Sequence, residues 1–355
     1  MHRPIAITLG DPAGIGPEII AKAFRDAPDD TKACFVAGDV DAMRRAARCL
    51  AGEGRVEIPI AVLGTPLDVL DVPPRCIAVL QIGAPMAPVQ LGKVSGVAGA
   101  MAARCVVWSA NAALRGDIAG LVTAPLNKEA LAAAGPPHCA FPGHTEMLQA
   151  LAAAYVGKPV SELPVRMMLA NNELRTVLVS IHVSLRAAIE AVTLDNVVQT
   201  LRITDRALTA LLGRAPRIAV AGLNPHAGEG GLFGREEIDA IAPAVALARA
   251  EGMDVHGPLA PDTVFMRART LRSRQGEFDV VVAMYHDQGL IPVKYLGVDR
   301  GVNVTLGLPL VRTSPDHGTA FDIAGTGRAD ASSLIEAIRM AKQIIGEARI
   351  SGRRK

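Results

Sequence analysis

Three histidines follow three apolar, strand-like segments of this sequence. They are His182 after Thr176–Ile181, His226 after Arg217–Gly222 and His286 after Asp279–Met284. Because the carboxyl ends of parallel strands meet at one edge of a sheet, we expect the three side chains to converge there. Three neutral imidazoles that leave one position open hold a divalent metal ion for chemistry, and imidazole suits zinc or cobalt better than magnesium. The alternative at each position is a structural, hydrogen-bonded histidine.

A second group of residues has the chemistry of an anion clamp. His144 and Thr145 directly precede a helical pattern, where free backbone N–H groups bind a carboxylate or phosphate. Lys294, Asn303 and Arg312 add two cations and an amide, and arginine binds oxyanions with two parallel hydrogen bonds. The alternatives are a helix-capping role for Thr145 and a structural ion pair for Arg312.

Two glycine-rich loops follow strand-like segments. The loop 10–18 matches neither dinucleotide nor P-loop spacing, so a tight turn is its default interpretation. The loop 226–234 contains four glycines between a strand and a helix, and glycines let a ligand approach the backbone closely. We therefore expect Asn224, Gly228, Gly230 and Gly231 to contact a dinucleotide phosphate. A general base is also needed, and Lys294, Asp287 or a metal-linked water are the candidates.

The composition limits the remaining classes of function. The net charge is +2 and 3% of the residues are aromatic, so a nucleic-acid partner is not expected. The sequence contains no run of ~18 apolar residues, so we expect no transmembrane helix. The first residues do not resemble a signal peptide. The five cysteines show no metal-ligand spacing. We predict a cytoplasmic protein with no membrane partner.

Short β-branched segments alternate with alanine-rich helical patterns, which predicts parallel strands in three-layer α/β units. The other expected strands are Ile5–Leu9, Ala33–Ala37, Gly120–Thr123 and Val165–Ala170. The expected helices are Gly16–Arg25, Asp39–Ala51, Val94–Leu114, Glu146–Val156, Asp195–Leu212, Arg235–Ala250 and Ser332–Glu347. Dense proline and glycine near residue 140 predict a boundary. We expect a first α/β/α domain of 1–140 plus 311–355, and a second of 141–310 with most metal and substrate residues.

Seven motifs in order resemble one known family. They are TLGDPAGIGPEI, TAPLNKEAL, FPGHTEML, GLNPHAGEGGLFGREEI, GPLAPDTVF, AMYHDQGLIPVKY and GVNVTLGLPLVRTSPDHGTAFDIAGTG. Together they are similar to the 4-hydroxythreonine-4-phosphate dehydrogenase family of pyridoxal phosphate biosynthesis, over residues 4–345. The resemblance implies an isocitrate/isopropylmalate dehydrogenase-like fold, with two α/β/α domains and a cleft between them. It also implies a homodimer with a shared active site.

The resemblance implies specific roles as well. His182, His226 and His286 would hold one divalent metal per subunit (Zn, Co or Mg), and His144, Thr145, Lys294, Asn303 and Arg312 would bind the substrate. The implied reaction is a metal-dependent, NAD- or NADP-linked oxidation of the 3-hydroxyl of 4-phosphohydroxy-L-threonine, to a 3-oxo acid that decarboxylates.

Three alternatives stay open. The first is a 4-phospho-D-threonate or erythronate 3-dehydrogenase of a catabolic pathway. The second is a cis-dihydrodiol dehydrogenase of aromatic-acid (terephthalate-type) catabolism, and the third is a non-catalytic phosphometabolite-binding protein.

Overall fold

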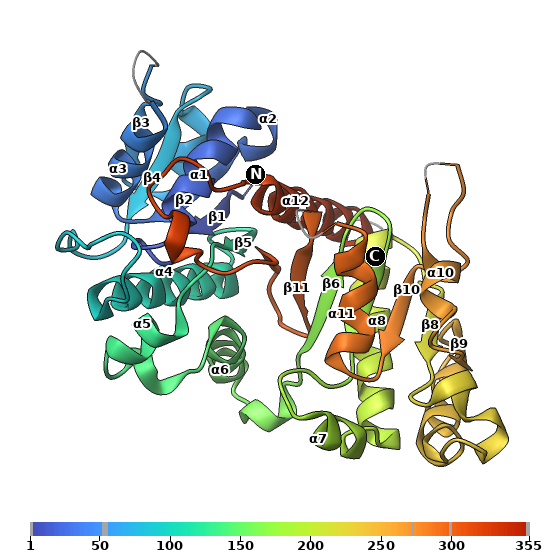
Figure 1. Cartoon of the computed structure of the whole chain (residues 1–355). Coiled ribbons are helices and arrows are strands. Elements are labelled where there is room, and N and C mark those ends of the chain that lie inside the picture. The colour runs from blue at the N-terminus through green and yellow to red at the C-terminus, as the bar shows by residue number, and fades with distance from the viewer. Residues whose placement is uncertain (1–2, 52–55, 272, 298–299, 353–355) are drawn as a thin grey trace. The chain divides into compact units, whose positions relative to one another are not determined.

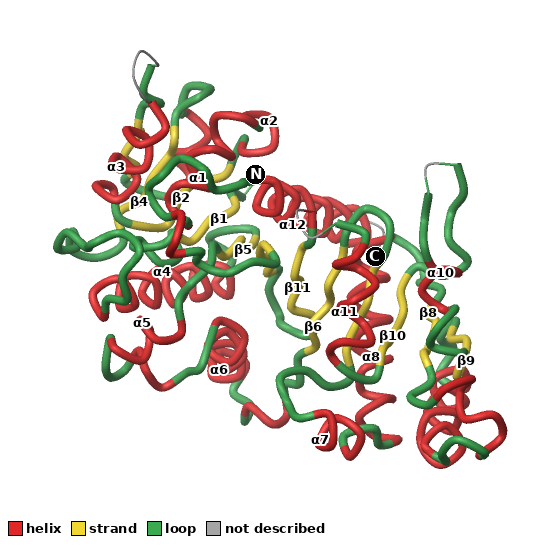
Figure 2. Tube along the Cα trace, viewed as in Figure 1, coloured by secondary structure: helices red, strands yellow, loops and turns green. Residues whose placement is uncertain are grey.

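The computed structural model describes residues 3–51, 56–271, 273–297 and 300–352. The chain divides into two compact units. Unit 1 comprises Met1–Pro164 and Leu308–Ile345, and unit 2 comprises Val165–Gly307 and Gly346–Lys355. Strands and helices alternate in both units (Figures 1 and 2), so the predicted α/β class is confirmed.

Unit 1 is built on parallel strands in the order β3-β4-β2-β1-β5-β12. They are β1 (Ile5–Thr8), β2 (Cys34–Gly38), β3 (Ile60–Leu63), β4 (Ile77–Gln81), β5 (Gly120–Thr123) and β12 (Arg312–Pro315). Strands β1, β2 and β5 are buried along their whole length, as expected for parallel strands with helices on both faces. The carboxyl ends of β1 and β5 lie side by side, because Thr8 pairs with Thr123.

Helices cover these strands. They are α1 (Gly16–Asp26), α2 (Pro28–Thr31), α3 (Val40–Ala51), α4 (Gly96–Arg115), α5 (Lys128–Ala133), α6 (His144–Val156) and α12 (Ser332–Gly352), with short 3-10 helices η1 (Pro66–Asp71), η2 (His138–Ala140), η3 (Val160–Glu162) and η7 (Phe321–Ile323). Figure 1 shows α1 and α3 on one side of the strands and α4, α5 and α6 on the other.

Helix α4 is the central helix of unit 1. Among the described helices it alone is long and apolar enough to cross a membrane, and 61% of that segment is buried inside the protein. Its residues Ala103, Val106 and Ala110 pack in one hydrophobic cluster with Leu121 of β5. Burial of this kind is typical of a core helix.

Helix α6 belongs to unit 1, whereas the expected boundary near residue 140 assigned it to the second domain. Its residues Met147 and Leu148 are buried in the same cluster as Leu121 and Leu131. The dense proline and glycine before α6 therefore mark a turn within unit 1, and the division between the units falls after Pro164.

Unit 2 has strands in the order β11-β6-β7-β10-β8-β9. They are β6 (Arg166–Ala170), β7 (Arg175–Leu178), β8 (Ile218–Ala221), β9 (Val255–Leu259), β10 (Val280–Ala283) and β11 (Val302–Leu306). Strands β7, β10, β8 and β9 are parallel, but β6 is antiparallel to both β7 and β11.

The expectation of purely parallel pairing is therefore wrong for β6. Only a short turn joins β6 to β7, and antiparallel strands accept such a turn whereas parallel strands need a long crossover. Asn171 closes this turn, because its side-chain oxygen accepts hydrogen bonds from the backbone amides of Glu173 and Leu174, each 2.9 Å long.

The helices of unit 2 are α7 (Leu185–Glu190), α8 (Leu194–Leu212), α9 (Ala242–Ala250), α10 (Val264–Ala268) and α11 (His286–Tyr295), with a 3-10 helix η4 (Pro225–Gly231) and a π-helical turn η5 (Glu237–Ile241). Leu290 and Val293 of α11 pack with Leu178, Val281 and Ala283 of the sheet. This packing holds the first residue of α11, His286, at the carboxyl end of β10.

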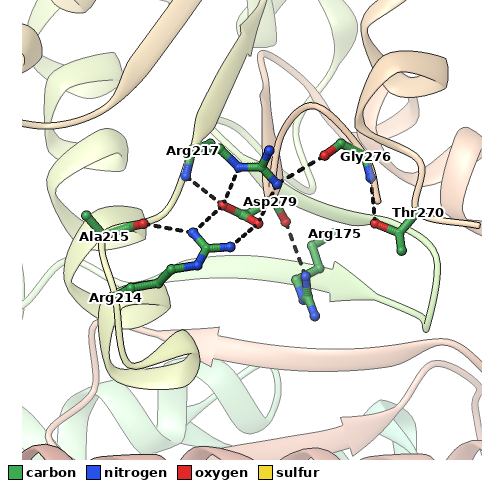
Figure 3. A network of polar contacts seen from close by, with 7 residues as sticks. All are labelled: Arg175, Arg214, Ala215, Arg217, Thr270, Gly276 and Asp279. Carbon is green, nitrogen blue, oxygen red and sulfur yellow. Dashed lines mark hydrogen bonds and ion pairs between the residues drawn. The ribbon is translucent and has the colours of Figure 1, made fainter. Parts of the chain in front are cut away.

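A network of charged side chains closes the opposite, amino-terminal ends of the same strands (Figure 3). Asp279 accepts two hydrogen bonds of 2.8 Å from the guanidinium of Arg214 and further bonds from Arg217. Arg175 donates to the backbone oxygen of Asp279. Burial alone would raise the pKa of Asp279, but the bonds from Arg214 and Arg217 more than offset it and lower the pKa well below 3.8.

Candidate active site

Two of the three predicted metal ligands lie side by side in unit 2. The imidazole rings of His182 and His286 have centroids 5.6 Å apart and are tilted by 46°. The chain beyond β7 reaches this position because the amides of Val179 and Ser180 donate to the carbonyl oxygens of Ala283 and Met284. Parallel pairing thus continues past the strand ends and delivers both histidines to one edge of the sheet.

Asp287 contacts the ring of His286. The Nδ1 atom of His286 and the Oδ1 atom of Asp287 are 2.7 Å apart. A carboxylate that accepts the Nδ1 proton fixes the tautomer in which Nε2 is a lone-pair donor, which is the usual arrangement behind a metal-binding histidine. In this structure the Asp287 carboxylate is placed to orient the His286 ring.

Gln288 connects the ends of two strands. Its side-chain oxygen accepts a 2.7 Å hydrogen bond from the amide of Met284, at the end of β10. Its side-chain nitrogen donates a 2.7 Å bond to the carbonyl oxygen of Gly222, at the end of β8. The turns that carry His286 and His226 are therefore linked through one side chain.

His226 lies in a run of left-handed backbone. His226, Ala227, Gly228, Glu229 and Gly230 all have positive φ, between 42° and 80°. Each non-glycine residue in this conformation costs roughly 1–2 kcal/mol, and such strain gathers at functional sites. The nearest aromatic neighbour of the His226 ring is Phe233, with centroids 6.2 Å apart.

Glu237 fills the base of the glycine-rich loop. Its Oε1 atom accepts hydrogen bonds of 2.7 Å from the amides of both Leu223 and Asn224. The Asn224 side chain donates to Glu236 and Glu237. Amides that would bind a phosphate in this part of the loop already bind a buried carboxylate, and Asn224 is engaged within the protein. The cofactor contacts predicted at Asn224, Gly228, Gly230 and Gly231 stay predictions.

The three-histidine cluster is assembled only in part. Across residues 3–51, 56–271, 273–297 and 300–352, no three histidine, cysteine, aspartate or glutamate side chains lie close enough together to hold a metal ion. His182 and His286 are adjacent, and the carboxylate behind His286 suits a metal ligand. The donor chemistry of His182 and His286 therefore fits a divalent ion, and the metal role expected of His226 stays a prediction.

Arg312 is the most deeply buried of the predicted substrate residues. It is the first residue of β12, is 4% exposed, and donates from Nη2 and Nε to the hydroxyl of Thr123 at 2.7 and 3.1 Å. Burial lowers the pKa of Arg312 to about 10, and the nearby carboxylate of Glu146 only partly offsets this.

His144 and Thr145 begin helix α6 in the same unit. Gly143 occupies the N-cap position, and no side chain caps the helix, so Thr145 does not act as the cap. The Nε2 atom of His144 is buried and has no hydrogen-bond partner among the described residues. Burial and the adjacent Arg312 lower the pKa of His144 well below 6.5, so the ring is neutral at pH 7. An uncapped helix terminus beside a buried cation is a favourable anion site.

The remaining predicted residues belong to unit 2. Lys294 lies in the last turn of α11, and Asn303 lies in β11 opposite Leu169. Asp287 is exposed, with 71% of its side chain accessible.

Several residues that shape these sites were not predicted. Glu237 and Gln288 hold the loops of unit 2, while Thr123 and Glu146 surround Arg312. Gln288 directly follows His286 and Asp287 in the sequence, and this position could have indicated that it belongs to the site. Glu237 gives no local signal, because only the fold brings it to Asn224.

Comparison with known proteins identifies the family. Residues 30–341 match the family model described as pyridoxal phosphate biosynthetic protein PdxA. A 4-hydroxythreonine-4-phosphate dehydrogenase from Beijerinckia indica is 50% identical over 97% of this chain and 96% of its own length. The chain belongs to the PdxA family.

Other members of the PdxA family differ in the substrate they are named for. A D-threonate 4-phosphate dehydrogenase from Salmonella typhimurium is 42% identical over 96% of this chain and 99% of its own length. A solved structure of 4-hydroxythreonine-4-phosphate dehydrogenase from Klebsiella pneumoniae matches with a TM-score of 0.82, at 42% identity, over 97% of this chain and 98% of that one. The resemblance and the prediction of a dehydrogenase are thus confirmed, and a dehydrogenase of this kind uses a nicotinamide cofactor.

Proposed function

We propose that this protein oxidises the 3-hydroxyl of 4-phosphohydroxy-L-threonine with NAD or NADP, and that the 3-oxo acid formed then loses carbon dioxide. The 50% identical relative bears the name of this activity. The observation that carries the proposal is the buried guanidinium of Arg312 beside the uncapped start of α6, because this arrangement suits a phosphate dianion.

The residues of unit 1 would bind the phosphorylated end of the substrate. Arg312 offers two parallel N–H groups, and the amides at the start of α6 add aligned donors. Neutral His144 would donate one hydrogen bond without adding charge. Thr145, next in the helix, would add a hydroxyl, and Lys294 and Asn303 are proposed as further ligands from the family resemblance.

In unit 2, His182, His226 and His286 would hold one divalent ion per subunit (Zn, Co or Mg). When bound, such an ion polarises the alcohol and stabilises negative charge on its oxygen, and the nicotinamide accepts the hydride. Asp287 would keep Nε2 of His286 available. The candidates for the general base are Lys294, Asp287 and a metal-linked water. We also propose a cytoplasmic homodimer with a shared active site.

The experiment compares substrates. Reduction of NAD and NADP is followed with 4-phosphohydroxy-L-threonine, 4-phospho-D-threonate and 4-phospho-D-erythronate, each with its dephosphorylated analogue, and with a cis-dihydrodiol carboxylate. We expect 4-phosphohydroxy-L-threonine to have the highest kcat/KM and to exceed its dephosphorylated analogue by at least ~tenfold.

The outcomes separate the alternatives. In Arg312→Ala the preference for the phosphorylated compound should shrink towards unity. A highest kcat/KM with 4-phospho-D-threonate or 4-phospho-D-erythronate would replace our proposal with the catabolic activity. A preference for the dihydrodiol would contradict the phosphate site, and no turnover of any compound would favour a binding protein.

A further inference from the structure

Unit 1 contains a cavity that none of the predicted catalytic, metal or substrate residues lines. Its volume is about 260 Å³. It lies at the amino-terminal ends of β2 and β4, between the end of α1 and the segment that follows η1. The carboxyl ends of the strands, where Thr123 and Asp11 lie, are at the other edge of the sheet.

The inner wall of the cavity is apolar. Phe24, Val69, Val72 and Ala78 line it, and Phe24, Val69 and Ala78 are buried in the unit. Cys34 adds a buried sulfur atom, and burial raises the pKa of this thiol to about 12, so it is uncharged. A ring or a branched aliphatic chain would find favourable surroundings here.

The rim carries unequal charge. Lys32 and Arg75 are exposed lining residues, and Asp29 is the acidic residue that accompanies them. Neither cation takes part in a side-chain hydrogen bond or ion pair with any part of the chain that the structure describes. The neighbouring carboxylate of Asp30 is bound by Arg339 at 2.7 Å. The mouth therefore favours an anion.

Arg75 also has a strained backbone, with φ of +64°. A residue other than glycine in this conformation costs roughly 1–2 kcal/mol. Glycine would adopt this conformation with less strain, yet an arginine occupies the position. Strained backbone of this kind clusters at functional sites.

We propose that this cavity is a second small-molecule site, which binds a compact carboxylate with an apolar body such as one aromatic ring or a branched chain. The volume lies just below the range of about 300–1,000 Å³ typical of ligand pockets, so the ligand is small. The apolar wall receives its body, and Lys32 and Arg75 receive its charge.

The test uses 4-(trifluoromethyl)benzoate as the probe, with the full-length protein. Binding is measured by titration with fluorine NMR, and the uncharged 4-(trifluoromethyl)benzamide is the control ligand. We expect saturable binding of the benzoate and weaker binding of the amide. Absence of saturable binding at millimolar benzoate would overturn the proposal, as would equal affinity for both compounds.

Cysteine alkylation locates the bound probe. Cys76 lines the cavity and is partly exposed, whereas Cys139 is exposed elsewhere in the unit. At about nine times its dissociation constant the probe occupies ~90% of the sites, so iodoacetamide should alkylate Cys76 roughly tenfold more slowly while Cys139 is unaffected. Equal slowing of both thiols, or of neither while the probe binds, would place the probe elsewhere.

Matched variants test the cavity itself. Leu70→Trp narrows the mouth and should abolish binding, whereas Leu67→Trp alters an equally exposed leucine of η1 that does not line the cavity and should leave binding unchanged. The double variant Lys32→Gln/Arg75→Gly should weaken benzoate binding by about tenfold and spare the benzamide. Thermal melting checks that each variant is folded. Unaltered binding in Leu70→Trp would contradict the proposal.

Discussion

Strands β7, β10 and β8 of unit 2 carry functional groups at both ends, and the two ends differ in how those groups are paired. At the amino-terminal ends, Arg175, Arg217 and Asp279 form one bonded network with Arg214. At the carboxyl ends of the same strands lie His182, His226 and His286. Because these strands are adjacent in the sheet, the same pairing places each set at one end of them.

The difference lies in the chemistry of the partners. At the amino-terminal end a carboxylate meets guanidinium groups, and hydrogen bonding to Asp279 raises the pKa of Arg214. Charges of opposite sign compensate each other in this network, so it requires no bound ligand. At the carboxyl end like groups meet, two imidazoles beside one exposed carboxylate. We propose that a bound ligand completes this set, so that the amino-terminal end stabilises the fold and the carboxyl end would perform the chemistry.

The largest expected effect comes from breaking the charge network. Asp279→Asn removes the carboxylate and leaves the arginines paired only with neutral groups. Because Arg214 and Arg217 are partly exposed, the free energy of unfolding should fall by about 3 kcal/mol, the lower end of the range for a buried pair. Chemical unfolding at pH 7 measures it. The control is Asp287→Asn at the other end, where the carboxylate is exposed and stability should be unchanged. Equal losses of unfolding free energy in the two variants would contradict the view that only the amino-terminal end stabilises the fold.

The same variant has a pH signature. The pKa of Asp279 is lowered in the folded protein, so its contribution to stability is present above the unfolded value of about 3.9 and is lost as the pH falls through the folded value. The difference in stability between wild type and Asp279→Asn should therefore be constant above about pH 5 and shrink below pH 4.

Removal of an imidazole at the opposite end should affect metal binding instead of stability. His286→Ala deletes a proposed ligand. Mutating a residue that only hydrogen-bonds to a metal ligand lowers metal affinity by about 10- to 100-fold, so loss of the ligand itself should lower it by more than ~100-fold. Titration calorimetry with Zn²⁺ or Co²⁺ measures the affinity, and unfolding of the metal-free variant measures stability. Unchanged affinity would show that His286 is not a ligand.

The comparison extends to two arginines. Arg214 has a carboxylate partner, while burial of Arg312 beside the Thr123 hydroxyl lowers its pKa. Arg312→Lys keeps the charge but loses the planar fork, so kcat/KM for the phosphorylated substrate should fall about 10- to 100-fold. Arg214→Lys should leave kcat/KM within about twofold of wild type. A large kinetic effect from Arg214→Lys would mean that the charge network of unit 2 also affects turnover.

The smallest expected effect concerns the strained turn. Ala227→Gly replaces a residue at φ 53° with one that accepts this conformation, and stability should rise by roughly 0.5–1 kcal/mol. Thermal melting measures it, and Ala250→Gly in helix α9 is the control that should destabilise. If Ala227→Gly also weakens metal binding, the rigidity of the turn contributes to the position of His226.

Sequence patterns predicted the long and regular elements of the fold. The β-branched segments gave β1, β2, β5, β6, β7, β8 and β10 within a few residues, because they are continuous apolar strands. Strands β3, β4, β9, β11 and β12 were missed. Strand β9 contains Gly257–Pro258, and β12 begins with Arg312 and ends with Pro315. Helix α11 was missed because Pro292 lies inside it.

The sequence predicted the part of the site whose residues directly follow recognisable strands. His182 and His286 were expected together and lie together. The left-handed turn at His226 and the carboxylate beneath it depend on contacts between residues distant in the chain, and no local pattern predicts them. The uncapped start of α6 likewise follows from the backbone at Gly143, which the composition of the segment does not specify.

The amide of Gln288 acts as a spacer of fixed length between two turns. It spans from the amide of Met284 to the carbonyl oxygen of Gly222, so the separation of these turns equals the reach of one side chain. A shorter residue such as asparagine would draw the turns together or leave both backbone groups unbonded. The separation of the turns that carry the proposed ligands His286 and His226 is therefore set in part by a residue that would not itself be a ligand.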